Sequence, residues 1–236
     1  MTVLDEEDLL VVDSGLSSDT FNKIARARLH ESEVNRRTTE AVKYFTNVGR
    51  PFSWWVGPGS RPLDLENRIR EHGLEATEYE LGMAMKLSVL PRKLNGPRDL
   101  TVRRVTCFEE LTDFASVFAA NWQPPDPAVF VFYRRAASIL LEERCPMKLF
   151  VGYLDDEPVA SSEVFLSGRI AGLYSVCTRR ERRGRGIGSA LTRVALDHAR
   201  CSGTLTAVLQ SSGAARGLYT RLGFRAFCGF AEFTLP

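Results

Sequence analysis

The sequence has no long hydrophobic run, no basic N-terminal segment and no ordered set of cysteines. No stretch approaches the roughly 20 apolar residues that a membrane helix needs. The chain starts with the acidic segment MTVLDEED, whereas a secretory signal starts with basic residues. The cysteines have neither a metal-binding spacing nor a disulfide framework; they are Cys107, Cys145, Cys177, Cys201 and Cys228. We therefore expect a cytoplasmic protein with reduced thiols, no metal site and no membrane partner.

The composition is that of an ordinary globular protein. The chain has 236 residues, of which 44% are hydrophobic and 25% charged, enough for one large or two small domains. The net charge of +2 implies no partner by itself. One basic cluster, Arg179–Arg185, suits a polyanionic small ligand or a nucleic acid equally well.

Residues 101–236 alternate between strand and helix patterns. The pattern predicts a strand and two helices, followed by a three-strand antiparallel meander and a third helix. After these it predicts a strand, a short helix and a final strand or strand pair. Their ranges are Thr101–Thr106, Phe108–Trp122, Ala128–Glu143, Lys148–Leu154, Pro158–Leu166, Ile170–Thr178, Gly186–Arg200, Thr204–Gln210, Ala214–Leu222 and Phe224–Leu235. This order predicts an α/β domain with a mostly antiparallel sheet.

Residues 1–95 have a different pattern. Polar helical stretches are predicted around Thr20–His30 and over Glu31–Asn47. A strand, a helix and a second strand follow, at Phe52–Val56, Leu63–Glu71 and Glu78–Leu87. The segment Pro91–Asp99, PRKLNGPRD, is typical of a linker.

A weak internal repeat relates the two halves. At an offset of 150 positions, Arg70–Leu74 falls on Thr220–Phe224, so that Gly73 matches Gly223. Both copies have the order strand, turn, short helix, glycine, strand. Chance is the alternative explanation, because this order is common in α/β proteins; duplication is favoured because the match needs no gap.

Three glycines at alternate positions, Gly184, Gly186 and Gly188, separate a strand from a helix. Such a turn brings backbone amides and a helix N-terminus close to an anion, and Arg183 and Arg185 add charged donors. The turn lacks the lysine of a P-loop. A dinucleotide fingerprint would need glycine at Ser189 and a parallel βαβ unit. Nucleic acid gives no reason for the spaced glycines, so we expect a phosphate-bearing small ligand and no nucleic-acid partner.

The order of motifs resembles the GNAT superfamily of N-acetyltransferases. Arg183, Gly186 and Gly188 match its acyl-CoA-binding pattern Arg/Gln-x-x-Gly-x-Gly/Ala. Gly172–Thr178 resembles its bulged fourth strand, Ala207–Ser212 its fifth strand, and Leu218–Phe224 its Tyr-x-x-x-Gly-Phe segment. The resemblance covers residues 101–236. It implies a GNAT-like mixed, mostly antiparallel twisted sheet flanked by helices, with acetyl-CoA as co-substrate.

The resemblance also implies the cofactor-binding residues. Backbone amides of the turn would hold the pyrophosphate; the turn residues are Arg183, Gly184, Arg185, Gly186, Ile187, Gly188 and Ser189. Main-chain groups of Val176, Cys177 and Thr178 would pair with the pantetheine and polarise the acetyl carbonyl. Ser211 and Ser212 would lie where the fourth and fifth strands part. Cys177 could also suggest a covalent nucleophile, but a strand cysteine without a partner is more often a small hydrophobe.

Two catalytic residues are predicted. Tyr219 would donate a proton to the departing sulfur, although in isolation it would be a core tyrosine. Glu163 is the only carboxylate within the three meander strands proper and is the candidate general base; a solvent-facing edge glutamate is the alternative.

The two halves therefore receive different predictions. Residues 101–236 are expected to be the catalytic GNAT acetyltransferase domain, moving acetyl to a primary amine of a small molecule or peptide. Residues 1–95 are expected to be a degenerate, partial GNAT-like domain without a cofactor site, because Ile69 stands where the repeat would place Tyr219 and nothing in residues 1–50 resembles the Arg-x-x-Gly-x-Gly turn. A tandem acetyltransferase with one decayed half would have this pattern. The alternative is a catalytically silent acyl-CoA-binding or protein-interaction module; a monomer and a homodimer are both compatible with the sequence.

Overall fold

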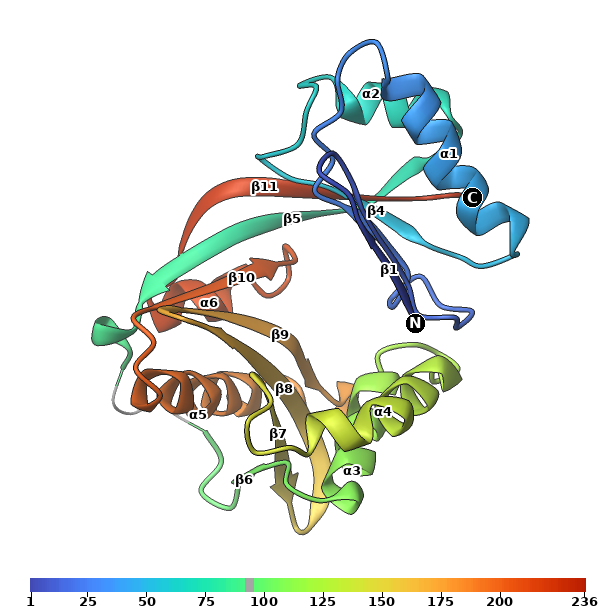
Figure 1. Cartoon of the computed structure of the whole chain (residues 1–236). Coiled ribbons are helices and arrows are strands. Elements are labelled where there is room, and N and C mark those ends of the chain that lie inside the picture. The colour runs from blue at the N-terminus through green and yellow to red at the C-terminus, as the bar shows by residue number, and fades with distance from the viewer. Residues whose placement is uncertain (92–95) are drawn as a thin grey trace. The chain divides into compact units, whose positions relative to one another are not determined.

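The structure, a computed structural model, describes residues 1–91 and 96–236 (Figure 1). It divides into two compact units, Met1–Leu81 with Cys228–Pro236, and Gly82–Phe227. This division differs from the predicted boundary between residues 95 and 101, because two long strands, β5 (Glu75–Lys86) and β11 (Arg225–Thr234), each run from one unit into the other. Residues 92–95 of the predicted linker lie outside the described residues. No described helix is long and apolar enough to cross a membrane.

The second unit is a mixed sheet with helices on both faces. Its elements are β6 (Thr101–Arg104), α3 (Phe108–Ala119), α4 (Pro127–Leu140), β7 (Met147–Leu154), β8 (Glu157–Ser167), β9 (Ile170–Thr178), α5 (Ile187–Cys201), β10 (Thr206–Ser211) and α6 (Arg216–Leu222). The strand order is β5-β10-β9-β8-β7-β6; β6 to β9 are antiparallel neighbours, and β10 is parallel to β9. The predicted meander and the predicted mixed, mostly antiparallel sheet flanked by helices are confirmed.

The two faces of this sheet carry different helices. Glu163 on β8 contacts Tyr133 of α4, and its ladder partner on β7 is Leu149. The next residue on β7, Phe150, points to the opposite face and packs edge-on against His198 of α5. Helices α4 and α5 therefore cover opposite faces, and Glu163 lies on the α4 face.

The first unit has its own sheet and core. Its elements are β1 (Thr2–Asp5), β2 (Leu10–Asp13), β3 (Lys23–Ala25), α1 (Val34–Asn47), β4 (Ser53–Val56) and α2 (Leu65–Glu71). The strand order is β1-β2-β3-β4-β11-β5, with β3 parallel to β4. Trp54, Phe45, Ile69 and Phe233 are fully buried at the centre of its core.

Most predicted elements are present within a few residues of their predicted ends, but the N-terminal segment differs. The helix predicted around Thr20–His30 is wrong: it contains β3, which pairs with β2 and β4. Strands β1 and β2 were not predicted. Ile24 is fully buried in the core, and the ladder on both sides of β3 supplies the backbone hydrogen bonds that a helix would have made internally.

Helices α2 and α6 end in the same way, 150 positions apart. Each is followed by a glycine in the left-handed conformation, Gly73 with φ 84° and Gly223 with φ 105°, and then by a buried apolar residue and a long strand. The closing backbone bonds also correspond: Gly73 N to Arg70 O (2.9 Å), Leu74 N to Ile69 O (3.3 Å), Gly223 N to Thr220 O (3.1 Å) and Phe224 N to Tyr219 O (3.0 Å). Glycine is favoured here because a Cβ disfavours positive φ.

This cap gives a stability prediction. An added Cβ would meet no atom within 4 Å at either Gly73 or Gly59, but only Gly73 has positive φ. We expect Gly73→Ala to lower the free energy of unfolding by about 1 kcal/mol, the cost of a left-handed alanine, in urea titrations followed by tryptophan fluorescence. Gly59→Ala is the matched control and should be neutral or slightly stabilising. Equal effects of the two substitutions would contradict the assignment.

Candidate active site

The glycine turn follows β9 and leads directly into α5. Gly184 and Gly186 have φ values of 78° and 79°, and Gly186 is the N-cap of α5. An L side chain would strain the backbone at both positions. The first amides of a helix have no intrahelical acceptor, and the helix dipole makes this end positive. The start of α5 is therefore suited to an anionic group.

A cavity of about 620 Å³ opens beside this turn. Four of the predicted cofactor-binding residues line it: Gly184, Arg185, Gly186 and Ser189. The remaining lining residues, Gly96, Pro97, Arg221 and Leu222, were not predicted as site residues. Arg221 adds a second guanidinium to the cavity. The sequence offered one signal for it, its position two residues after Tyr219.

Other residues of the turn hold it in place. Arg183 donates from Nε to the Thr178 carbonyl at 2.9 Å and from Nη2 to Asn121 Oδ1 at 3.4 Å. Ile187 is buried in the core. A Cβ added to Gly188 would lie 3.4 Å from both Leu218 Cδ1 and Thr178 Oγ1. The end of β9, the start of α5 and helix α6 thus meet at the turn.

Strands β9 and β10 part before they reach the turn. Ile170–Gly172 pair in register with Thr206–Val208, and beyond these positions the described residues of the two strands are not ladder partners. Val176–Thr178 and Ser211–Ser212 lie past the last pair. The ladder between the two strands therefore ends before these predicted cofactor-binding residues.

A β-bulge in β9 lies next to Glu163. The β8–β9 register shifts between Ser161 and Glu163, so that Ser175 and Val176 together oppose a single residue. Ser175 has φ 49°, and its Oγ donates to Glu163 Oε1 at 3.0 Å. Tyr133 Oη donates to Glu163 Oε2 at 3.2 Å. Each carboxylate oxygen is therefore held by a hydroxyl group.

Burial determines the electrostatics of this group. Loss of water raises the pKa of Glu163 above its ordinary value, while the hydrogen bonds from Ser175 and Tyr133 lower it. Burial also raises the pKa of Tyr133, followed by the nearby Glu163 charge. The edge position considered for Glu163 is wrong, because β8 is an inner strand of the sheet and the side chain faces α4.

Tyr219 is buried on α6. Its ring packs edge-on against Phe224 with centroids 5.8 Å apart, and it is 6% exposed. Its neighbour Leu218 lies beside Gly188, and Arg221 and Leu222 of the same helix line the cavity. Helix α6 therefore carries the predicted acid and also contacts the glycine turn.

Residues 108–224 match the family model described as Acetyltransferase (GNAT) family. This segment belongs to the GNAT acetyltransferase family. It includes the bulge, Glu163, the glycine turn and Tyr219. A comparison with curated protein sequences found no match.

The likeness to solved structures extends over nearly the whole chain and is not confined to the GNAT segment. A GCN5-related N-acetyltransferase from Kribbella flavida has a TM-score of 0.76 and 18% identity, covering 100% of this chain and 89% of its own. One from Sphaerobacter thermophilus has a TM-score of 0.69 and 18% identity, with coverage of 96% and 75%. A tandem GNAT protein from the clavulanic acid biosynthesis pathway has a TM-score of 0.65 and 12% identity, with coverage of 96% and 77%. At these identities the likeness shows the fold alone.

The first unit differs from the GNAT segment at the positions that correspond to the gap, the glycine turn and Tyr219. The segments that follow its parallel strands β3 and β4 are joined by bonds from Arg61 N to Ala27 O (2.9 Å) and from Leu29 N to Arg61 O (3.0 Å). Helix α1 has Glu33 as its N-cap, and Ile69 occupies the place of Tyr219. No group of three or more metal-ligating side chains is found among the described residues of the chain.

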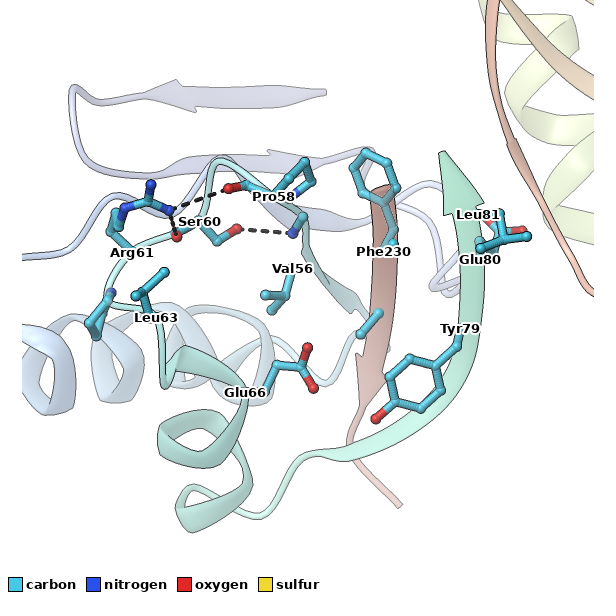
Figure 2. A pocket seen from close by; sticks show the side chains of 14 residues that line it. Val56, Pro58, Ser60, Arg61, Leu63, Glu66, Tyr79, Glu80, Leu81 and Phe230 are labelled. Atoms are coloured by element: carbon cyan, nitrogen blue, oxygen red, sulfur yellow. Dashed lines mark hydrogen bonds between the residues drawn. The ribbon is translucent and has the colours of Figure 1, made fainter. Parts of the chain in front are cut away.

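A cavity of about 510 Å³ in the first unit has a different lining from the one at the turn. Figure 2 shows Glu66 and Tyr79 directed toward its centre, below the loop that carries Arg61. Arg61 Nη1 donates to the carbonyls of Pro58 and Ser60, and Ser60 Oγ accepts from Gly57 N. These loop groups hold the loop's own conformation.

Cys177 lies in the GNAT segment with its thiol shielded. Asn121 Nδ2 donates to its Sγ at 2.7 Å, and burial raises the pKa of the thiol to about 11. Because the thiolate is the nucleophilic form, Cys177 is poorly suited to covalent catalysis at neutral pH. The interpretation of Cys177 as a small hydrophobe agrees with this environment.

This environment predicts slow alkylation. At pH 8 a thiol with this pKa is ionised to only about one part in a thousand. We expect iodoacetamide to modify Cys177 at least roughly 100-fold more slowly than the exposed Cys201, measured by peptide mass spectrometry. The rate at Cys177 should rise with pH until about 11. Equal rates at the two cysteines near neutral pH would show that the thiol is not shielded.

Proposed function

We propose that the chain is an acetyl-CoA-dependent N-acetyltransferase that acts on a primary amine of a small molecule or peptide. The observation that carries this proposal is the juxtaposition of the cavity at the glycine turn, the parted strands and the bulge that contacts Glu163. Together they offer an anion site, a gap with free backbone edges, and a carboxylate beside that gap.

The donor would be held mainly by backbone groups. The amides of Arg183–Ser189 would bind the pyrophosphate, and the guanidinium groups of Arg185 and Arg221 would add charge-assisted hydrogen bonds. Arg183 would act differently, because its side chain is bonded to Thr178 and Asn121 and thereby fixes the turn against β9. Val176–Thr178 would pair with the pantetheine, with Ser211 and Ser212 on the other side of the gap.

The chemistry needs a base, a carbonyl-polarising group and an acid. Glu163 would take the proton that the amine loses as its nitrogen attacks the thioester carbonyl. Main-chain amides after the bulge would stabilise the negative oxygen, and Tyr219 would protonate the sulfur as the carbon–sulfur bond breaks. The raised pKa of Glu163 supports the basic role, since a base works best when its pKa lies near the working pH.

The first unit would be a degenerate GNAT-like copy that binds no acetyl-CoA. The matching ends of α2 and α6 support the common origin. The closed backbone after β3 and β4 would leave no gap for a pantetheine, and Glu31 and Glu33 before α1 would repel phosphate. One acetyl-CoA per chain is therefore expected.

Binding tests the donor site. We expect isothermal titration calorimetry to give one acetyl-CoA site per chain. Ser189→Glu should weaken binding at least roughly tenfold, because it places a negative charge in the cavity, while a glutamate in the first turn favours the helix. Ser202→Glu, at the exposed far end of α5, is the control for added charge. Two sites per chain, or no effect of Ser189→Glu, would contradict this arrangement.

Turnover tests the catalytic assignment. Tyr219→Phe should leave acetyl-CoA binding intact and reduce kcat by roughly 100-fold, the usual worth of a general acid. For the wild type, kcat/KM should rise with pH through a pKa above the ordinary value of a glutamate, because only ionised Glu163 accepts a proton. Glu163→Gln should remove this rise. Acetyl-CoA binding without turnover of any acceptor would instead favour a silent acyl-CoA-binding module.

A further inference from the structure

The open side of Glu163 is surrounded by aromatic rings. Tyr174 is its ladder partner on β9, so the two side chains share a face, and Tyr174 is 44% exposed. Phe165, two residues along β8 on the same face, is 38% exposed. Large aromatic side chains left open beside a buried carboxylate offer a surface on which a ring can pack.

A second set of rings extends from Tyr133 along α3. The Tyr133 ring packs edge-on against Phe118 with centroids 6.2 Å apart, and Phe118 packs against Trp122 at 5.4 Å. Phe118 and Trp122 are half-buried. Asn121 contacts Cys177 at 2.7 Å, which places this end of the helix over β9 just after the bulge. Aromatic surface therefore lies on both sides of Glu163.

Among the described residues, no cation contacts Glu163: only two neutral hydroxyl donors, Tyr133 and Ser175, bond its carboxylate. The neighbouring cations are engaged: Arg183 bonds the Thr178 carbonyl and Arg179 the Pro158 carbonyl. An acceptor carboxylate would find no counterion beside Glu163, and burying it unpaired would be costly.

We propose that the acceptor is a primary amine attached to an uncharged, ring-bearing apolar body. The nitrogen faces Glu163, and the ring packs against Tyr174 and the Phe118–Trp122 pair. This inference rests on the proposed acetyltransferase function and names its substrate class. Amino acids are poor acceptors, because each brings a carboxylate that would lie unpaired beside Glu163.

Matched amines test the proposal by release of free CoA thiol. 2-Phenylethylamine, ethylamine and phenylalanine differ by one ring or one carboxylate. We expect kcat/KM for 2-phenylethylamine to exceed that for each of the other two by at least roughly tenfold, from burial of the ring or avoidance of an unpaired carboxylate. Equal or higher values for ethylamine or phenylalanine would overturn the substrate class.

A substitution at Tyr174 tests where the ring of the acceptor packs. Tyr174→Ala should reduce kcat/KM for 2-phenylethylamine at least roughly fivefold and leave that for ethylamine nearly unchanged. Phe108→Ala, a comparably exposed ring at the start of α3, is the control and should alter neither. Equal losses for both amines in Tyr174→Ala would overturn the assignment of Tyr174.

Acetyl-CoA binding separates the two levels of inference. A protein that binds acetyl-CoA but acetylates none of these amines, or prefers phenylalanine, overturns the ring-bearing class and leaves the donor site standing. A protein that does not bind acetyl-CoA overturns the proposed function itself.

Discussion

The arrangement of the second unit depends on a parallel strand pair that forms and then stops. Strands β9 and β10 share a ladder over Ile170–Gly172 and Thr206–Val208 only. A full ladder would satisfy the backbone groups of both strands and leave no room between them. Because the ladder stops, the end of β9 is no longer paired with β10 at the place where the chain enters the glycine turn. The turn, the bulge and α6 are all positioned around that gap.

The first unit shows what closes such a gap. Its strands β3 and β4 are also a parallel pair with a helix between them in the chain. Here Arg61, in the segment after β4, forms backbone hydrogen bonds through its N and O atoms to the segment after β3. Two backbone hydrogen bonds thus replace an opening with a continuous structure. The two units also differ in charge and chemistry: Glu31 and Glu33 precede α1, and Ile69 on α2 stands where α6 has Tyr219. Similar architecture therefore leaves the strands unpaired beyond a short ladder in one unit and joins the following segments in the other.

The surroundings of Glu163 illustrate how a neutral shell tunes a carboxylate. Burial disfavours its charge, and two hydroxyl donors partly restore it, without any cation to hold it permanently ionised. A cation in contact would lower the pKa and weaken the group as a base. The bulge is essential here, because the positive φ of Ser175 accompanies the contact of its hydroxyl with the carboxylate.

The sequence by itself determined the local features. Helical and alternating periodicity placed the elements from β6 to β11 within a few residues. Gly184 and Gly186 indicated a left-handed backbone conformation before a helix, since few other residues adopt this conformation. The repeat at 150 positions indicated matching helix ends, because a glycine cap is a local motif.

Tertiary structure decided what depends on distant partners. Strand β3 is only three residues long and exists through its ladders with β2 and β4, so Thr20–His30 was mistaken for a helix. The unit boundary follows two strands that pass through both units. Tyr133, Ser175 and Arg221 are far from one another in sequence, and only packing of α4, β9 and α6 brings them to Glu163 and the cavity. Burial, which raises the pKa of Glu163, is likewise a property of the folded chain.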